Sequence, residues 1–302
     1  MGFKDTSYEE HTKHFGTIND EDIQKWSRTD TVDHWRHKRM FDTLLPLLNN
    51  NKKNKWLTIG DGRYGIDAQY LQQYSDNVVA SDITGERLKI AKEKGYINEY
   101  SVQNAERMTF EDNSFDFILC KETYHHLPRP AIAVYEMLRV AKKGIVFIEP
   151  NDENIIIPQT QSFSSAFFWL KQSFKNLIKK QMKKPAYYNQ GNYEDVGNYV
   201  YSISEREIEK IALGLNYEMV AFKGINDFYI AGVEHEPAVN GNILFEKIKK
   251  EILRFDNLVK NGNKKYGLLT AIIFKEMPSE NCVKEMKEMG YKVTKLTKNP
   301  YL

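Results

Sequence analysis

The chain has 302 residues, and 43 lysines and arginines against 41 aspartates and glutamates leave a net charge of +2. This balance excludes the global positive field of a nucleic-acid binder, and an apolar content of 41% excludes a disordered chain. The two cysteines, Cys120 and Cys282, cannot form a disulfide framework or a cysteine-rich zinc site. No apolar run reaches the roughly 18 residues of a membrane span, and the N-terminus lacks a secretory signal. We therefore expect a globular, cytoplasmic protein.

The first fifty residues change from polar to amphipathic sequence. Leucines and a methionine recur at helical spacing over 40–48, although Pro46 is expected to bend or end that helix. We predict a helical lid over residues 1–50, in which Trp35 and Arg36 either close over a ligand or pack the leading helix. His34 and His37 share a helix face beside Asp33, but a zinc site needs more ligands, so no metal is predicted.

From residue 56 onward, short apolar runs alternate with helical stretches. Strands are predicted at 56–60, 77–81, 115–120 and 144–150, with a short sheet segment near 97–104, and helices at 66–74, 85–95 and 131–143. After residue 204 the sequence predicts a helix at 204–216, strands at 217–225 and 266–276, a helix at 279–290 and a short strand at 291–296, with an interruption at about 235–263. This alternation indicates βαβ units and a doubly wound, mostly parallel sheet.

A glycine-rich turn follows the first predicted strand. Gly60, Gly62 and Gly65 match the pattern G-x-G-x-x-G, and Asp82 ends the next strand about 20 residues later. Glycines let a ligand approach the backbone, the following helix offers free N–H groups, and the acid can bind a ribose diol. The pattern alone fits a dinucleotide or any other ribose-bearing ligand.

A second block of motifs separates these possibilities. It comprises Asn104-Ala105-Glu106, Phe110, Asp112, Ser114-Phe115-Asp116 and His125-His126-Leu127, followed by the strand 144–150. In this order the block resembles class I S-adenosylmethionine-dependent methyltransferases, particularly the branch of ubiquinone and menaquinone enzymes, over residues 55–150. The resemblance implies a Rossmann-like sheet of seven strands and S-adenosylmethionine as cofactor.

The resemblance also implies a role for each matching residue. Gly60 and Gly62 would pass beneath the methionine and ribose of the cofactor, Asp82 would bind the ribose diol, and Ile83 would pack on the adenine. Ala105 and Glu106 would flank the adenine, with Asn104 near its amino group, while Cys120 and Lys121 would close the methionine side. Two positions depart from the family pattern, because Thr58 stands where an acid is usual and Tyr64 where a third glycine is usual. Arg63 is placed to pair with the cofactor carboxylate.

Transfer to an oxygen or nitrogen atom also requires a base of near-neutral pKa. Lys121, Glu122, Tyr124, His125 and His126 follow the fourth predicted strand, and Glu149 ends the fifth. We predict Glu122 and His125 as the candidate bases. Packing or capping of the turn before Pro128 is the alternative for His125 and the preferred role for His126.

An insert interrupts the sheet pattern between residues 151 and 204. Its tyrosines and asparagines suit a sugar-like acceptor or pack on one another: Tyr187, Tyr188, Asn189, Asn192, Tyr193, Asn198, Tyr199 and Tyr201. Residues 162–184 carry six lysines and no acid around an apolar stripe. This segment is predicted to be a cap helix that buries its stripe, with contact to an anionic membrane surface as the alternative.

Together these features predict four regions: a lid (1–50), the cofactor-binding half of the sheet (51–150), an inserted cap (151–204) and the C-terminal half of the sheet with a tail (205–302). The predicted activity is S-adenosylmethionine-dependent methyl transfer, by O-methylation, to a small-molecule or sugar-like acceptor, without nucleic acid as partner. The alternatives are an NAD-dependent oxidoreductase and a non-catalytic binding protein on the same fold. The oligomeric state does not follow from the sequence.

Overall fold

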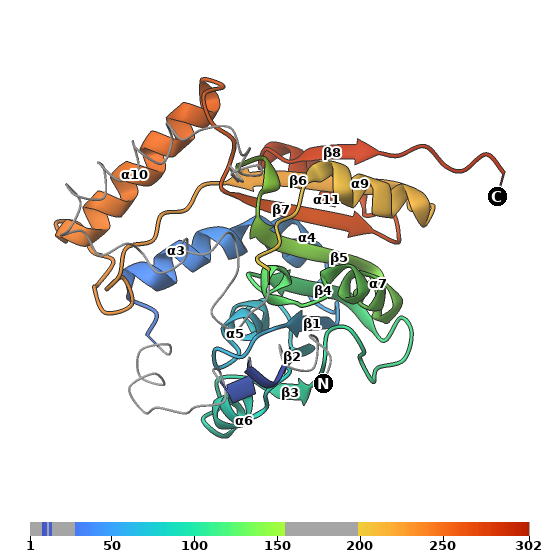
Figure 1. Ribbon diagram of the computed structural model, residues 1–302, viewed down its shortest axis with the longest axis horizontal. Helices are drawn as coiled ribbons and strands as arrows, with labels where there is room; N and C mark the ends of the chain where they lie inside the picture. The colour runs from blue at the N-terminus through green and yellow to red at the C-terminus, as the bar shows by residue number, and fades with distance from the viewer. Residues whose placement is uncertain (1–7, 11, 14–27, 155–198, 302) are drawn as a thin grey trace, which may run out of the picture.

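The computed structural model describes residues 8–10, 12–13, 28–154 and 199–301. Eight strands form one sheet in the order β3-β2-β1-β4-β5-β7-β6-β8 (Figure 1). The strands are β1 (Trp56–Ile59), β2 (Val78–Asp82), β3 (Glu99–Val102), β4 (Phe115–Lys121), β5 (Ala141–Pro150), β6 (Met219–Ile225), β7 (Leu268–Phe274) and β8 (Lys292–Lys295). The expected doubly wound sheet is therefore confirmed, and the short tail strand β8 extends it from seven strands to eight.

The strand directions follow from the crossovers. The pairs β1–β2, β1–β4, β2–β3 and β4–β5 are parallel, whereas β7 lies antiparallel between β5 and β6. The central strands β1 and β4 are covered on both faces, and their residues are buried almost without interruption, not in alternation. The chain reverses its order beside β1, and ligands of such sheets bind outside the carboxyl ends of the strands at that point.

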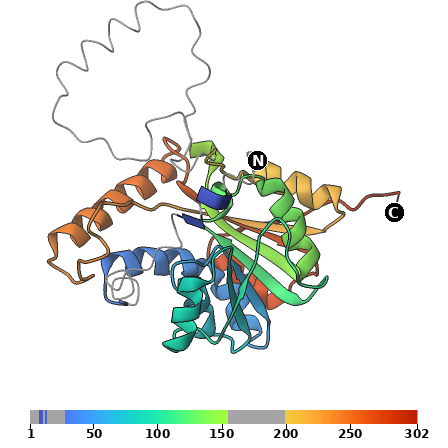
Figure 2. The same ribbon diagram turned by 60° about the horizontal axis from the view of Figure 1, so that its bottom comes forward.

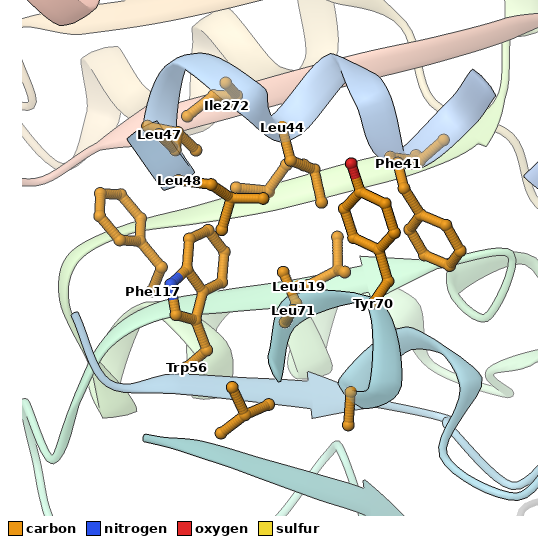
Figure 3. Close-up of a cluster of buried hydrophobic side chains, with 14 of the residues drawn as sticks. Phe41, Leu44, Leu47, Leu48, Trp56, Tyr70, Leu71, Phe117, Leu119 and Ile272 are labelled. Carbon is orange, nitrogen blue, oxygen red and sulfur yellow. The ribbon is translucent and has the colours of Figure 1, made fainter. Parts of the chain in front are cut away.

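Helices cover both faces of the sheet. The helices are α3 (Val32–Phe41), α4 (Leu45–Asn50), α5 (Ile66–Gln72), α6 (Glu86–Glu93), α7 (Pro130–Val140), α9 (Glu205–Gly214), α10 (Ile243–Lys260) and α11 (Glu280–Glu288). Apolar side chains of α4, α5, α6 and α11 form one buried cluster with the sheet, and those of α7 and α9 form a second one. Figure 3 shows part of the first cluster, where Trp56 stacks on Phe117 and Phe41 on Tyr70.

Three predicted boundaries need correction. Pro46 does not end a helix but lies in the first turn of α4, where its missing N–H costs nothing. Residues 141–143 belong to β5 and not to the preceding helix, which ends at Val140. The interruption predicted at about 235–263 contains the 18-residue helix α10, whose N-cap Asn242 accepts a hydrogen bond from the N–H of Phe245.

Helix α10 lies beside α3 at one side of the sheet (Figure 2). Val32 of α3, Val233 and the α10 residues Phe245, Ile248 and Ile252 make a third, separate apolar cluster. This cluster holds α3 and the segment between β6 and α10 together, next to the carboxyl ends of the parallel strands. None of the helices that the structure describes is long and apolar enough to cross a membrane.

Candidate functional site

A cavity of about 660 Å³ opens at the carboxyl ends of β1, β2 and β4. Its lining comes from the loop after β1, the ends of β2 and β4, residues 103–105, helix α3 and the segment 227–234. The position is the switch point of the doubly wound sheet. The volume lies in the range of roughly 300 to 1,000 Å³ that is usual for small-molecule sites.

The loop after β1 packs so tightly that its positions 60 and 62 leave no room for a side chain. Gly60 has a φ of +73°, and a Cβ atom there would lie 2.2 Å from Cγ2 of Thr123. A Cβ atom on Gly62 would lie 2.8 Å from Oδ2 of Asp82. The two glycines therefore bring the loop against the ends of β4 and β2, and Gly62 keeps the space beside the Asp82 carboxylate open.

Asp61 fixes the same loop through hydrogen bonds to its side chain. Its carboxylate accepts hydrogen bonds from the N–H groups of Asp67 (3.1 Å) and Ala68 (2.9 Å) in the first turn of α5. It also accepts one from the Thr58 hydroxyl at 2.8 Å. Thr58 stands where the family pattern usually has an acid, and it donates a hydrogen bond to Asp61. Burial, together with the nearby carboxylate of Asp67, holds the pKa of Asp61 well above its ordinary value.

Tyr64 stands where the family pattern usually has a third glycine. Its φ of +59° is a left-handed conformation that glycine usually supplies. The ring is buried, and the guanidinium of Arg87 lies 5.7 Å from its centroid. The chain therefore keeps the loop conformation with a tyrosine that is held by packing.

Asp82 faces the cavity from the end of β2. Its Oδ1 accepts hydrogen bonds from the backbone N–H and the hydroxyl of Thr84, both at 2.8 Å. Burial raises the pKa of Asp82, although these bonds and one from the Gly62 N–H oppose the shift. The carboxylate is fixed in orientation and lies beside the glycine loop, as a ribose-binding acid requires.

A chain of charged groups crosses the floor of the cavity. Lys121 Nζ lies 3.4 Å from Oδ1 of Asp67 and 3.2 Å from Oε2 of Glu122, whose other neighbour is Nδ1 of His37 at 3.4 Å. Burial alone would raise the pKa of Glu122, but attraction to Lys121, His37 and Arg63 outweighs it, so the net shift is downward. Burial lowers the pKa of His37 well below its usual range. Glu122 is therefore ionised, can bind a cationic group and is a weak base.

His125 is held by a buried acid. Its Nδ1 lies 2.7 Å from Oε2 of Glu149, which is completely buried at the end of β5. The other oxygen, Oε1, accepts the N–H groups of Thr123 (2.7 Å) and Tyr124 (2.8 Å). Because a carboxylate only accepts hydrogen bonds, Nδ1 carries the proton and the basic lone pair is on Nε2.

One wall of the cavity was only partly anticipated from the sequence. Six residues, here called the α3 wall, come from α3 and from the segment after β6: Asp33, Arg36, His37, Asp227, Tyr229 and Glu234. Arg36 is buried and pairs with Asp33 at 2.7 Å and with both carboxylate oxygens of Asp227. Of these six, Asp33, Arg36 and His37 had been noted in the sequence, and Asp227, Tyr229 and Glu234 had not. No local pattern indicates the other residues, because they join the wall only when two segments that are distant in the sequence pack together.

All but two of the predicted site residues line the cavity. Those lining it are Gly60, Gly62, Arg63, Asp82, Ile83, Asn104, Ala105, Lys121, Glu122 and His125. The exceptions are Glu106 and Cys120. The carboxylate of Glu106 turns to Arg129, accepting from its backbone N–H at 2.8 Å. Cys120 points into the apolar core, where its thiol lies 3.8 Å from Glu149.

Trp35 does not line the cavity but packs edge-to-face on Phe245, with ring centroids 5.0 Å apart. His126 lines it, with its ring 4.0 Å from that of His125. Among the described residues, no group of three or more potential metal ligands is found. The lysine-rich segment 162–184 and most of the tyrosine-rich insert lie outside the described residues. Tyr201, at the end of the insert, packs on Tyr124.

Comparison with known proteins gives one family match and several relatives. Residues 57–148 match the methyltransferase domain family. The chain is 30% identical over 95 residues to the 2-methyl-6-phytyl-1,4-hydroquinone methyltransferase of Synechocystis sp., which covers 30% of this chain and 30% of that protein. It is 23% identical over 216 residues to the demethylmenaquinone methyltransferase of Oceanobacillus iheyensis, covering 68% of this chain and 86% of that protein.

Solved structures give a weaker likeness. Magnesium protoporphyrin IX methyltransferase from Synechocystis PCC 6803, crystallised with bound SAH, is 14% identical with a TM-score of 0.45. That match covers 90% of this chain and 95% of the other. The family match, in contrast, contains the glycine loop, Asp82 and Lys121, all of which line the cavity.

Proposed function

Since residues 57–148 belong to the class I S-adenosylmethionine-dependent methyltransferases, we propose that this protein transfers a methyl group from S-adenosylmethionine to a hydroxyl of a small molecule. The observation that carries the proposal is the space kept open by Gly62 beside the fixed carboxylate of Asp82. A ribose diol fits a carboxylate held in this way, and the bare glycine backbone lets the nucleoside approach closely.

The charges around the cavity suit the rest of the cofactor. S-adenosylmethionine supplies a sulfonium methyl group, an ammonium and a carboxylate. Glu122, ionised and held between Lys121 and His37, is the proposed partner of the ammonium. Arg63 lines the cavity and is the proposed partner of the carboxylate. Ile83 and Ala105 line the part of the cavity that we assign to the adenine.

His125 is the proposed general base. Glu149 fixes its tautomer, so Nε2 can accept the proton that the acceptor hydroxyl loses as its oxygen attacks the methyl carbon. The methyl–sulfur bond breaks in the same displacement, and the products are a methyl ether and S-adenosylhomocysteine. Glu122, the other predicted base, is less suited because its pKa is lowered.

A thermal-shift assay with S-adenosylmethionine, S-adenosylhomocysteine and NAD tests the proposal. Ligands that bind only the folded state at about 100 times their Kd stabilise it by about 2.7 kcal/mol, which gives a measurable rise in Tm. We expect both adenosyl ligands to raise the Tm and NAD to leave it unchanged. Stabilisation by NAD alone would indicate an oxidoreductase, and binding without transfer to any acceptor would indicate a non-catalytic protein.

A further inference from the structure

Tyr229 presents an exposed aromatic ring to the cavity in a fixed orientation. The side chain lines the cavity and 51% of the residue is exposed. Its hydroxyl donates to Oε1 of Glu234 at 2.8 Å, and the Arg36 guanidinium lies 5.1 Å from the ring centroid. A tyrosine held at both its hydroxyl and its ring loses little further freedom when a ligand packs on it.

The ring is fixed because its neighbours are fixed. Arg36 is 5% exposed and is held between Asp33 on its own helix and Asp227 after β6. Glu234 also accepts the N–H of Gly232, which anchors it to its own turn. Tyr229 therefore belongs to a rigid part of the α3 wall and is not a loose surface side chain.

Negatively charged groups outnumber positively charged ones in this wall. It contains three carboxylates, of Asp33, Asp227 and Glu234, and one guanidinium. Burial raises the pKa of Asp33, attraction to Arg36 opposes that shift, and repulsion from Glu234 and Glu122 adds to it. A ligand with negative charge would increase this repulsion, whereas a ligand that supplies hydroxyl donors would not.

We propose that the α3 wall is the acceptor subsite and that Tyr229 determines its specificity for an uncharged, polyhydroxylated ring such as a hexopyranoside. The apolar C–H face of the ring stacks on Tyr229, while its hydroxyls donate to Asp33 and Glu234. The inference rests on the proposed methyl transfer, which supplies the cofactor and the base in the same cavity. It places the acceptor contacts on α3 and residues 227–234 instead of the tyrosine-rich insert.

Saturation-transfer NMR and calorimetry test this subsite on the full chain saturated with S-adenosylhomocysteine. The probes are a panel of methyl hexopyranosides, a hexose 6-phosphate and 1,4-hydroquinone. We expect at least one neutral glycoside to bind, the sugar phosphate to bind more weakly, and Tyr229→Ala to raise the glycoside Kd roughly tenfold. Tyr229→Phe, which keeps the ring, should retain most of the affinity.

Tyr135 provides a matched control, because it is 52% exposed on α7 and does not line the cavity. Tyr135→Ala should leave glycoside affinity unchanged. The subsite assignment is overturned if no glycoside binds the saturated protein, if Tyr229→Ala binds glycosides as the parent does, or if hydroquinone or the sugar phosphate binds in preference. Failure of S-adenosylhomocysteine to bind the parent protein would instead contradict the proposed function.

Discussion

His125 and Glu149 join the ends of β4 and β5 through a hydrogen bond of 2.7 Å between Nδ1 and Oε2. Glu149 is completely buried, and two backbone N–H groups hold its other oxygen. The imidazole can therefore neither rotate nor exchange tautomers without breaking this arrangement. A histidine fixed in this way at the edge of a cavity is suited to accept a proton at Nε2.

The isosteric change Glu149→Gln tests this pair. The glutamine amide would donate to Nδ1 and move the imidazole proton to Nε2, so the base would be lost while the packing is kept. We expect kcat to fall by roughly 10²-fold or more, with His125→Asn giving a similar loss, and the affinity for S-adenosylhomocysteine to persist. Glu207→Gln is the control, since Glu207 bonds the Tyr124 hydroxyl outside the cavity lining. Unchanged kcat in both Glu149→Gln and His125→Asn would remove the pair from the mechanism.

The pH dependence of kcat separates the two predicted bases. The pKa of Glu122 is lowered in the folded protein, so this carboxyl stays ionised above pH 5 and cannot cause an acid limb between about pH 5 and 8. We expect Glu122→Gln to raise the KM for S-adenosylmethionine but to keep any acid limb of kcat. Steady-state kinetics over that pH interval would show the limb disappearing with Glu122→Gln if Glu122 were the base.

Gly62 offers a steric test of the cofactor site. In Gly62→Ala the new methyl group would lie 2.8 Å from Oδ2 of Asp82 and would occupy the space assigned to the ribose. We expect at least a roughly tenfold loss of S-adenosylhomocysteine affinity by calorimetry, with the fold retained. Gly214→Ala is the matched control, because nothing lies within 4 Å of an added Cβ atom there. Equal affinity in the two variants would show that the ligand does not approach Gly62.

The Arg36 ion pairs should contribute strongly to stability. Arg36→Met leaves the carboxylates of Asp33 and Asp227 without their shared buried cation, which typically costs about 3 kcal/mol. Urea unfolding should show a loss of this size. The exposed pair of Arg206 and Glu209 serves for comparison, and Arg206→Met should change the free energy of unfolding by less than about 1 kcal/mol. Similar changes in the free energy of unfolding of the two variants would mean that Arg36 does not stabilise the α3 wall.

The sheet and the cofactor side of the cavity could be predicted from the sequence because their signals are local. The strand 56–60, the glycine turn and Asp82 each follow from a short pattern. Helix α10 was missed although its signal is also local: Asn242 can cap it, and Phe245, Ile248 and Ile252 recur at helical spacing. Helix α10 packs beside α3 and away from the sheet, so the alternation of strands and helices did not indicate it.

The α3 wall could not be predicted in the same way. Arg36 and Asp227 are 191 residues apart, and their pairing arises only when the segment after β6 packs on α3. The role of Asp61 is similarly hidden, because an acid between two glycines does not show which helix it caps. The side-chain directions of Cys120 and Glu106 also depend on packing, so motif position alone does not show that neither residue lines the cavity.

Calorimetric titration of the parent protein and of Asp82→Ala with S-adenosylhomocysteine tests the central claim most directly. We expect one ligand to bind the parent protein and no measurable binding to Asp82→Ala, because the fixed carboxylate at the end of β2 holds the ribose. No binding to the parent protein, or the same affinity in both proteins, would contradict it.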